Sequence, residues 1–221
     1  MNFLKIKNFL LLFLIIFSYL ISVVKTYAVD ITADRTISSS SDGDQYNIKT
    51  NNDIDVIVTN NSTLERNQKI FNVSAASLTG SSITIHLGSS VIAETNSIFS
   101  NGAELTITNT GTIEATNSKA INVSNSDGVS ITNNNNGVIK SNNNTILGDA
   151  GTGADNVTID NSGEIYTTAT GTESSAIVFA NNDTGNTITN NSGGEIYSSG
   201  SESTIVLGVS STLTNSGSIK N

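Results

Sequence analysis

Residues that could do chemistry are scarce in this chain. His86 is the single histidine, and no Gly-x-Ser-x-Gly or Gly-Asp-Ser-Gly turn accompanies it, although a Ser–His–Asp triad requires a nucleophile held in such a turn. Cysteine is absent, so a zinc site built from Cys and His has no ligand set. We therefore interpret His86 as a surface residue and predict no catalytic, cofactor-binding or metal-binding residue.

Acidic residues suggest a cation site in only two places. Residues 150–157 approach the calcium nonapeptide Gly-Gly-x-Gly-x-Asp-x-U, but the known sites form between tandem copies, and this chain has one copy. We interpret the segment as a Gly/Asp turn that leads into a strand. The sequence Asp42-Gly43-Asp44 is interpreted as a turn for the same reason.

A short apolar–polar–Asn phrase recurs along the chain and predicts its architecture. It reads Ile-Thr-Asn at 107–109, 131–133 and 188–190 and recurs in altered form elsewhere. Its apolar residue falls at positions 58, 85, 107, 131, 159, 188 and 213, at intervals of 22 to 29 residues. A period in the twenties with β-forming residues indicates a solenoid, in which each unit buries its apolar face by stacking on its neighbours.

Each unit contains three short strands, which are clearest at residues 105–123. Apolar and polar residues alternate over runs too short for an amphipathic helix, and Asn and Gly separate the runs. The apolar positions of the first and second strands are six residues apart in most units and eight apart in two. Because both spacings are even, every side chain keeps its own face. The predicted inward sets are Val58, Leu64 and Phe71/Val73; Ile85, Val91 and Ile98; Ile107, Ile113 and Ile121/Val123; Ile131, Ile139 and Ile146; Ile159, Ile165 and Ile177/Phe179; and Ile188, Ile196 and Ile205/Leu207.

Asparagine recurs two residues after the first apolar position of each unit. Stacked at one corner of the solenoid, these amides could donate and accept hydrogen bonds along the axis, so we predict a structural asparagine ladder. Asn and Gly also tolerate the left-handed backbone that a sharp corner requires. The predicted ladder comprises Asn60, Asn109, Asn133, Asn161, Asn190 and Asn215, followed by Gly111, Gly137, Gly163, Gly194 and Gly217.

The N-terminus and the composition predict an exported protein. Lys5 and Lys7 precede an apolar run that ends before Lys25-Thr26-Tyr27-Ala28, which is the layout of a signal peptide over residues 1–28. Residues 29–53 are expected to form an N-terminal cap whose apolar residues lie out of register with the repeats, and residues 54–221 to form about six rungs, incomplete at the C-terminus. The mature chain would carry seven basic against nineteen acidic residues, which argues against nucleic acid as a partner. Proline is absent, as continuous backbone ladders require.

The variable segments at 148–156, 168–174 and 181–186 are expected to project from one side of the solenoid. They are small and polar, and they contain neither an aromatic platform nor a basic cluster. Binding by these segments is therefore not predicted from their composition.

The phrases ITNTGTIEATN, IDNSGEIYTTA and LTNSGSIKN, together with the signal-like N-terminus and the lack of cysteine, resemble the passenger region of a bacterial autotransporter. The resemblance covers roughly residues 54–221. It implies an all-β fold, a right-handed parallel β-helix, displayed on the surface of a Gram-negative bacterium or released from it. The family's C-terminal translocator barrel has no counterpart in this sequence. The expected role is a monomeric stalk or adhesin-like surface with an unidentified surface or glycan partner, not an enzyme.

Two other classes remain open. β-Helical polysaccharide lyases share this fold, and by resemblance they use clustered aspartates for calcium and a Lys or Arg as base; Asp155, Asp160 and Asp183 would be the cluster, with Lys119 or Lys140 as base. This reading predicts a groove of acidic residues. A phage or S-layer fibre is the third class, which predicts trimers or a lattice.

Overall fold

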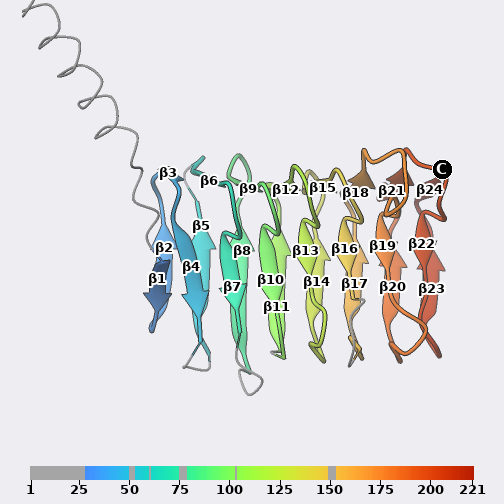
Figure 1. The fold of residues 1–221 in the computed structure, drawn as a ribbon, viewed down its shortest axis with the longest axis horizontal. Helices are drawn as coiled ribbons and strands as arrows, with labels where there is room; N and C mark the ends of the chain where they lie inside the picture. The colour runs from blue at the N-terminus through green and yellow to red at the C-terminus, as the bar shows by residue number, and fades with distance from the viewer. Residues whose placement is uncertain (1–27, 50–52, 60, 75–78, 103, 149–152) are drawn as a thin grey trace, which may run out of the picture.

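The described chain consists of three parallel β-sheets wound into one solenoid. The computed structural model describes residues 28–49, 53–59, 61–74, 79–102, 104–148 and 153–221. Within these ranges the regular secondary structure consists of β-strands alone, and each of the three sheets has eight strands. The strands of each sheet follow one another along the long axis of the molecule (Figure 1). The predicted fold class, an all-β solenoid of about six rungs, is confirmed.

We call the sheets A, B and C. Sheet A contains β1 (Ala28–Ile31), β4 (Gln45–Ile48), β7 (Phe71–Val73), β10 (Ile98–Ser100), β13 (Ile121–Asn122), β16 (Ile146–Leu147), β19 (Ile177–Val178) and β22 (Ile205–Val206). Sheet B contains β2 (Arg35–Ile37), β5 (Asp55–Val58), β8 (Ser81–Ile85), β11 (Leu105–Asn109), β14 (Ser130–Asn133), β17 (Thr158–Asn161), β20 (Thr187–Asn190) and β23 (Thr212–Asn215). Sheet C contains β3 (Ser41–Asp42), β6 (Thr63–Arg66), β9 (Ser90–Ala93), β12 (Thr112–Ala115), β15 (Val138–Ser141), β18 (Glu164–Thr167), β21 (Glu195–Ser198) and β24 (Ser218–Lys220).

The core lies inside the solenoid and is built from columns of like residues. In sheet C, Ile113 pairs with Val91 on one side and Ile139 on the other, and all three are fully buried. Strand residues alternate between the two faces, so the neighbours of Ile113 in β12 point outward, while the column that contains Ile113 is buried inside the solenoid. Burial of each such side chain contributes about 1.5–3 kcal/mol, and this term rather than cross-linking stabilises the chain.

The segment 29–53, expected as a cap, continues the sheets in register. Tyr46 pairs with Phe71 and Ile48 pairs with Val73, and Ile37 pairs with Val58 in sheet B. The expectation that Ile31, Ile37, Tyr46 and Ile48 would lie out of register was therefore wrong. Gly43, with a φ of +91°, turns the chain between β3 and β4 as the Asp-Gly-Asp sequence predicted, and this keeps the alternation in phase.

Two of the predicted inward positions need a shift of two residues. Ile107 pairs with Ile83, not with Ile85, and Ile83 in turn pairs with Val56 rather than Val58. Val58 and Ile85 are buried all the same, because a shift of two preserves the face. With the correct register the first-to-second spacing is eight in four units and six in three. The other predicted inward sets agree with the strand pairing, except for Leu207, which is 36% exposed because β22 is the last strand of sheet A.

The corner glycines between sheets B and C were predicted for the wrong reason. Positive φ angles at the eight-residue corners belong to Asn61, Gly88, Asn136 and Gly193 instead. Glycine is required at the predicted positions for lack of space: a Cβ on Gly163 would lie 2.2 Å from the carbonyl oxygen of Gly137. The other predicted glycines, Gly111, Gly137, Gly194 and Gly217, are crowded in the same way.

The predicted signal peptide, residues 1–28, lies outside the described residues except for its last residue. In the part of the chain that the structure describes, no helix has the length and apolar character that a membrane span requires.

Candidate functional site

Side chains that could bind a partner gather on the outer face of sheet C. The residue that follows each inward position points outward there, and successive strands stack these residues in one column. The column reads Glu65, Ile92, Glu114, Lys140, Tyr166, Tyr197 and Lys220. Sheet B, by contrast, presents mostly Thr and Ser outward at the paired positions, as in Thr106, Thr108 and Thr132.

Two adjoining hollows follow this column along the solenoid axis, and we call them together the sheet C groove. The first, about 310 Å³, is lined by Glu114, Ala115, Thr116, Lys140, Ser141, Asn142, Tyr166 and Thr168. The second, about 320 Å³, is lined by Glu65, Arg66, Asn67, Ile92, Ala93, Glu94 and Thr116. Thr116 lines both, so the two hollows adjoin at this residue. From β6 to β18 the groove crosses four strand spacings, which is roughly 20 Å.

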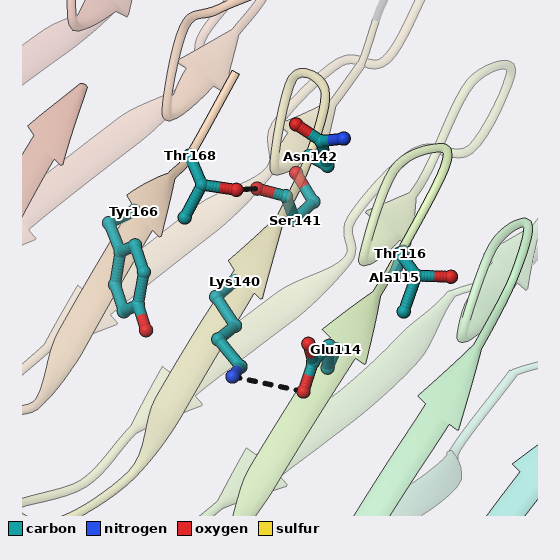
Figure 2. Close-up of a pocket in the computed structure, with 8 residues that line it drawn as sticks. All are labelled: Glu114, Ala115, Thr116, Lys140, Ser141, Asn142, Tyr166 and Thr168. Carbon is teal, nitrogen blue, oxygen red and sulfur yellow. Dashed lines mark hydrogen bonds and ion pairs between the residues drawn. The ribbon is translucent and has the colours of Figure 1, made fainter. Parts of the chain in front are cut away.

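Tyr166 forms one end of the first hollow, and an ion pair lies on the two strands next to it. The Nζ of Lys140 lies 3.0 Å from the Oε2 of Glu114, and Figure 2 shows the lysine directed toward that glutamate and away from Tyr166. Burial would lower the pKa of Lys140, but the hydrogen bond and charge of Glu114, together with Tyr166, raise it above its ordinary value. Lys140 is therefore held as a cation, on the strand next to the aromatic ring.

The turns after the strands make the side of this hollow. Thr168 donates its hydroxyl hydrogen to the backbone oxygen of Ser141 at 3.2 Å, and Asn142 lies beside them (Figure 2). These turns present amide and hydroxyl groups within reach of the space above the sheet. Together with Tyr166, they combine one aromatic surface with several neutral hydrogen-bonding groups, which is the composition typical of a site for a polar ligand.

Tyr166 is fixed from its other side by Tyr197. The two rings are stacked with their centroids 4.5 Å apart and their planes 7° from parallel. Burial, the neighbouring Tyr166 and the charge of Glu164 raise the pKa of Tyr197, so its hydroxyl stays protonated and donates toward the Oε2 of Glu164 at 3.5 Å. The stack therefore restricts the Tyr166 ring before any ligand is present.

Arg66 lines the second hollow, but its guanidinium group is hydrogen-bonded within the protein. It is 8% exposed, and its Nη1 donates to the Oε1 of Gln45 at 2.6 Å and to the backbone oxygen of Lys69 at 2.9 Å. Its burial lowers its pKa, against the raising effect of Asp44. The open part of this hollow is lined by Glu65, Glu94 and Ile92.

His86 is exposed, as predicted, and its partner is a threonine. Its Nδ1 lies 3.2 Å from the Oγ1 of Thr59 on the preceding rung. Neither an acid nor a nucleophile is recorded in contact with it in the described chain. The next residue, Leu87, is 63% exposed, whereas Ile85 is buried and pairs with the ladder residue Asn109.

The three aspartates of the lyase hypothesis do not form a cluster. Asp183 is fully buried, and its carboxylate accepts hydrogen bonds from the backbone N–H groups of Ala154 and Ala180 at 2.8 and 2.7 Å. Asp155 accepts from the backbone of Thr184 at the same corner, whereas Asp160 lies on the outer face of sheet B. Within the described ranges, no group of three or more His, Cys, Asp or Glu residues could hold a metal ion.

The calcium-like segment and the two candidate bases have structural partners. Residues 149–152 lie outside the described residues, and Gly153 has a φ of +95°, as expected for a Gly/Asp turn. Lys119 pairs with Glu173 at 3.3 Å, and Lys140 pairs with Glu114. The two lysines are therefore engaged by glutamates rather than by the aspartates.

The asparagine ladder is confirmed from Asn109 onward. The Nδ2 of Asn109 donates to the Oδ1 of Asn133 at 2.9 Å, and the next three links are 2.8 Å each. The remaining members are Asn161, Asn190 and Asn215. Asn60 lies outside the described residues, and the ladder column on the N-terminal side of Asn109 holds Ile85, Val58 and Ile37.

The groove residues were missed because the sequence was searched for binding groups in the variable segments. The available signal was the repeated Glu-Ile-Tyr at 164–166 and 195–197. Since its isoleucine faces the core, the flanking Glu and Tyr must share one outer face.

Comparison with known proteins gives no relative for this chain: no family model, no curated protein and no solved structure matches it.

Proposed function

We propose that this chain is an exported, surface-displayed solenoid that acts as a stalk and adhesive surface, of the kind that autotransporter passengers provide. The observation that carries the proposal is the pair of adjoining hollows on the outer face of sheet C. Small Thr and Ser residues cover much of the outer face of sheet B, whereas the outer face of sheet C gathers tyrosine, lysine and glutamate.

The design of the solenoid supports a stalk. Each rung contacts its neighbours through backbone pairing in all three sheets, so length can be added without a new fold. The sequence has no cysteine and no proline, and its net charge of −9 favours solubility. The signal-like layout of residues 1–28 supports export.

A polysaccharide lyase is less well supported. The candidate aspartates Asp155, Asp160 and Asp183 lie apart or bind backbone N–H groups, and Lys119 and Lys140 are paired with glutamates. A fibre that forms trimers or a lattice has no specific observation in its favour.

Surface display can be tested in the organism that carries the gene. Antibodies against the chain should label intact cells, and the N-terminus of the mature protein, read by mass spectrometry, should begin at Val29. Extending the coding sequence beyond residue 221 should reveal further rungs followed by a translocator barrel. Recovery of the protein solely from the cytoplasm, with Met1 retained, would overturn the proposal.

A further inference from the structure

We propose that the sheet C groove binds a linear, uncharged polysaccharide, with the ring of Tyr166 as its main contact. This inference names a partner class for the adhesive surface proposed above and rests on it.

The shape of the groove favours a linear polymer. Its two hollows share Thr116 and run along the axis from the strand of Glu65 to the turn at Thr168, across roughly 20 Å. A compact ligand would fill one hollow, whereas an extended chain would occupy both.

The chemistry of the floor excludes other extended polymers. A peptide strand pairs with the free backbone groups of a sheet edge, but the groove lies on the face of sheet C, where these groups are already paired within the sheet. Nucleic acid is excluded by charge: Glu65, Glu94 and Glu114 outnumber Lys140 and the buried Arg66. The same imbalance disfavours acidic polysaccharides. An uncharged chain of sugars remains.

Tyr166 offers the contact that sugars use. The face of an aromatic ring carries partial negative charge, and the C–H groups on one side of a sugar ring carry partial positive charge, so the two stack. Tyr197 covers one face of Tyr166 at 4.5 Å and leaves the other toward the hollow, where Lys140 is drawn away to Glu114 at 3.0 Å (Figure 2). Asn142, Thr168 and Thr116 then lie where hydroxyl groups of a sugar could be bonded.

Pre-organisation adds to the affinity. The stacked tyrosines and the Lys140–Glu114 pair are in place without ligand, so binding orders few side chains. The groove is open along its length, which suits a weak site that is repeated along a surface rather than a tight pocket.

The experiment is a binding measurement on the purified chain. Hexamers of β-1,4-linked glucose and of β-1,4-linked N-acetylglucosamine would be titrated by calorimetry, with polygalacturonate as the anionic comparison. We expect at least one neutral hexamer to bind and polygalacturonate not to bind. Binding of neither hexamer, or binding of polygalacturonate alone, would overturn the proposal.

Variants locate the site. Tyr166→Ala should weaken binding by roughly tenfold or more, the order expected for one lost aromatic contact, whereas Tyr166→Phe keeps the ring face and should bind nearly as the parent does. Phe99→Ala removes an outward-facing aromatic side chain from sheet A and is the matched control. Equal loss in Tyr166→Ala and Phe99→Ala would place the binding elsewhere. Circular dichroism verifies that each variant keeps its strands.

The proposed ligand of the groove and the proposed surface display can be tested independently. Binding is measured on the purified chain, and surface location is measured on intact cells. A cytoplasmic protein that still binds a neutral hexamer through Tyr166 would overturn the proposed display alone, and a surface protein that binds none would overturn the groove alone.

Discussion

The two halves of the solenoid fill the same corner in different ways. In the N-terminal half the ladder column holds Val58 and Ile85, and four residues later the corner holds Ser62 and Ser89. In the C-terminal half the corners of equal length hold Asn133 with Gly137, and Asn190 with Gly194. The exchange of an apolar residue for asparagine is therefore accompanied by an exchange of serine for glycine.

Space explains the coupling. A Cβ placed on Gly137 would lie 2.3 Å from the Oδ1 of Asn133, and one on Gly194 would lie 2.5 Å from the Oδ1 of Asn190. The amide that links the rungs occupies the volume that the serine side chain fills in the other half. The comparison shows that the ladder is a two-residue device, in which asparagine supplies the hydrogen bonds and glycine supplies the room.

The largest effect is expected for alanine placed at the corner. Gly137→Ala should lower the free energy of unfolding by about 4 kcal/mol, because its Cβ meets both the Asn133 amide and the backbone oxygen of Asn109 at 2.7 Å. Ser89→Ala is the matched variant in the apolar half. It keeps the Cβ and removes a buried hydroxyl that has no hydrogen-bond partner, so it should change stability by no more than about 0.5 kcal/mol. Urea unfolding followed by circular dichroism measures both, and similar effects in the two variants would contradict the comparison.

Removal of a ladder amide should have the next largest effect. Asn161→Ala deprives the Oδ1 of Asn190 of its donor and the Nδ2 of Asn133 of one of its acceptors, links that are each 2.8 Å long within the buried corner. A buried group left without its partner costs about 1–3 kcal/mol, so we expect a loss of about 2 kcal/mol in urea unfolding. Asn117→Ala, at an exposed asparagine, is the control. A cost below about 1 kcal/mol for Asn161→Ala would mean that the ladder contributes little beyond backbone pairing.

A double substitution tests whether the two residues act as a pair. Asn133→Val with Gly137→Ser converts one corner of the ladder half into the arrangement of the apolar half. The double variant should be more stable than the sum of the single effects predicts, by about 1.5 kcal/mol, because the valine removes the amide oxygen that lies nearest to the serine Cβ, although the backbone oxygen of Asn109 remains. The measurement is a double-mutant cycle by urea unfolding. Strict additivity would refute the coupling.

Most of the architecture could be predicted because a repeat reports the same constraint many times. The even spacing of isoleucines identified the inward faces, and the Asn of each Thr-Asn or Asp-Asn pair identified the ladder from Asn109 to Asn215. The same parity concealed the error at Val58 and Ile85. The Thr59-Asn60 pair resembles Thr108-Asn109, and a shift of two residues leaves every side chain on its own face.

The groove could not be predicted by comparing residue types within a single unit of the repeat. Its members are Glu, Ile, Lys and Tyr at one phase of the repeat, and they share no chemistry in sequence. They acquire a common role once pairing places Glu114 beside Lys140 and Lys140 beside Tyr166. Arg66 is similar: it faces inward in a column that otherwise holds Ala93, Ala115 and small polar residues, and its acceptors come from other segments.

The smallest effect on stability is expected for a substitution in the connections between sheets C and A, in which the two halves also differ. In the ladder half, residues 168–176 join β18 to β19 and reach back to earlier rungs through Glu173, which accepts from the Nδ2 of Asn143 at 2.8 Å and pairs with Lys119 at 3.3 Å. The hydrogen bond from Asn143 and the charge of Lys119 lower the pKa of Glu173 below its ordinary value of 4.5. A carboxylate whose pKa is lowered by folding stabilises the protein above its unfolded pKa, and this contribution is lost as the pH falls through the folded value.

Glu173→Gln should therefore be less stable than the parent at pH 6, and the difference should be smaller at about pH 3, below the ordinary value of 4.5, because the contribution is lost as the carboxylate becomes protonated. The side chain of Glu173 is 56% exposed and screened by water, so the difference should stay below about 1 kcal/mol. Urea unfolding at both pH values measures it, with Glu104→Gln, at an exposed glutamate, as control. If the difference were the same at both pH values, it would reflect the shape of the loop rather than the charge of Glu173.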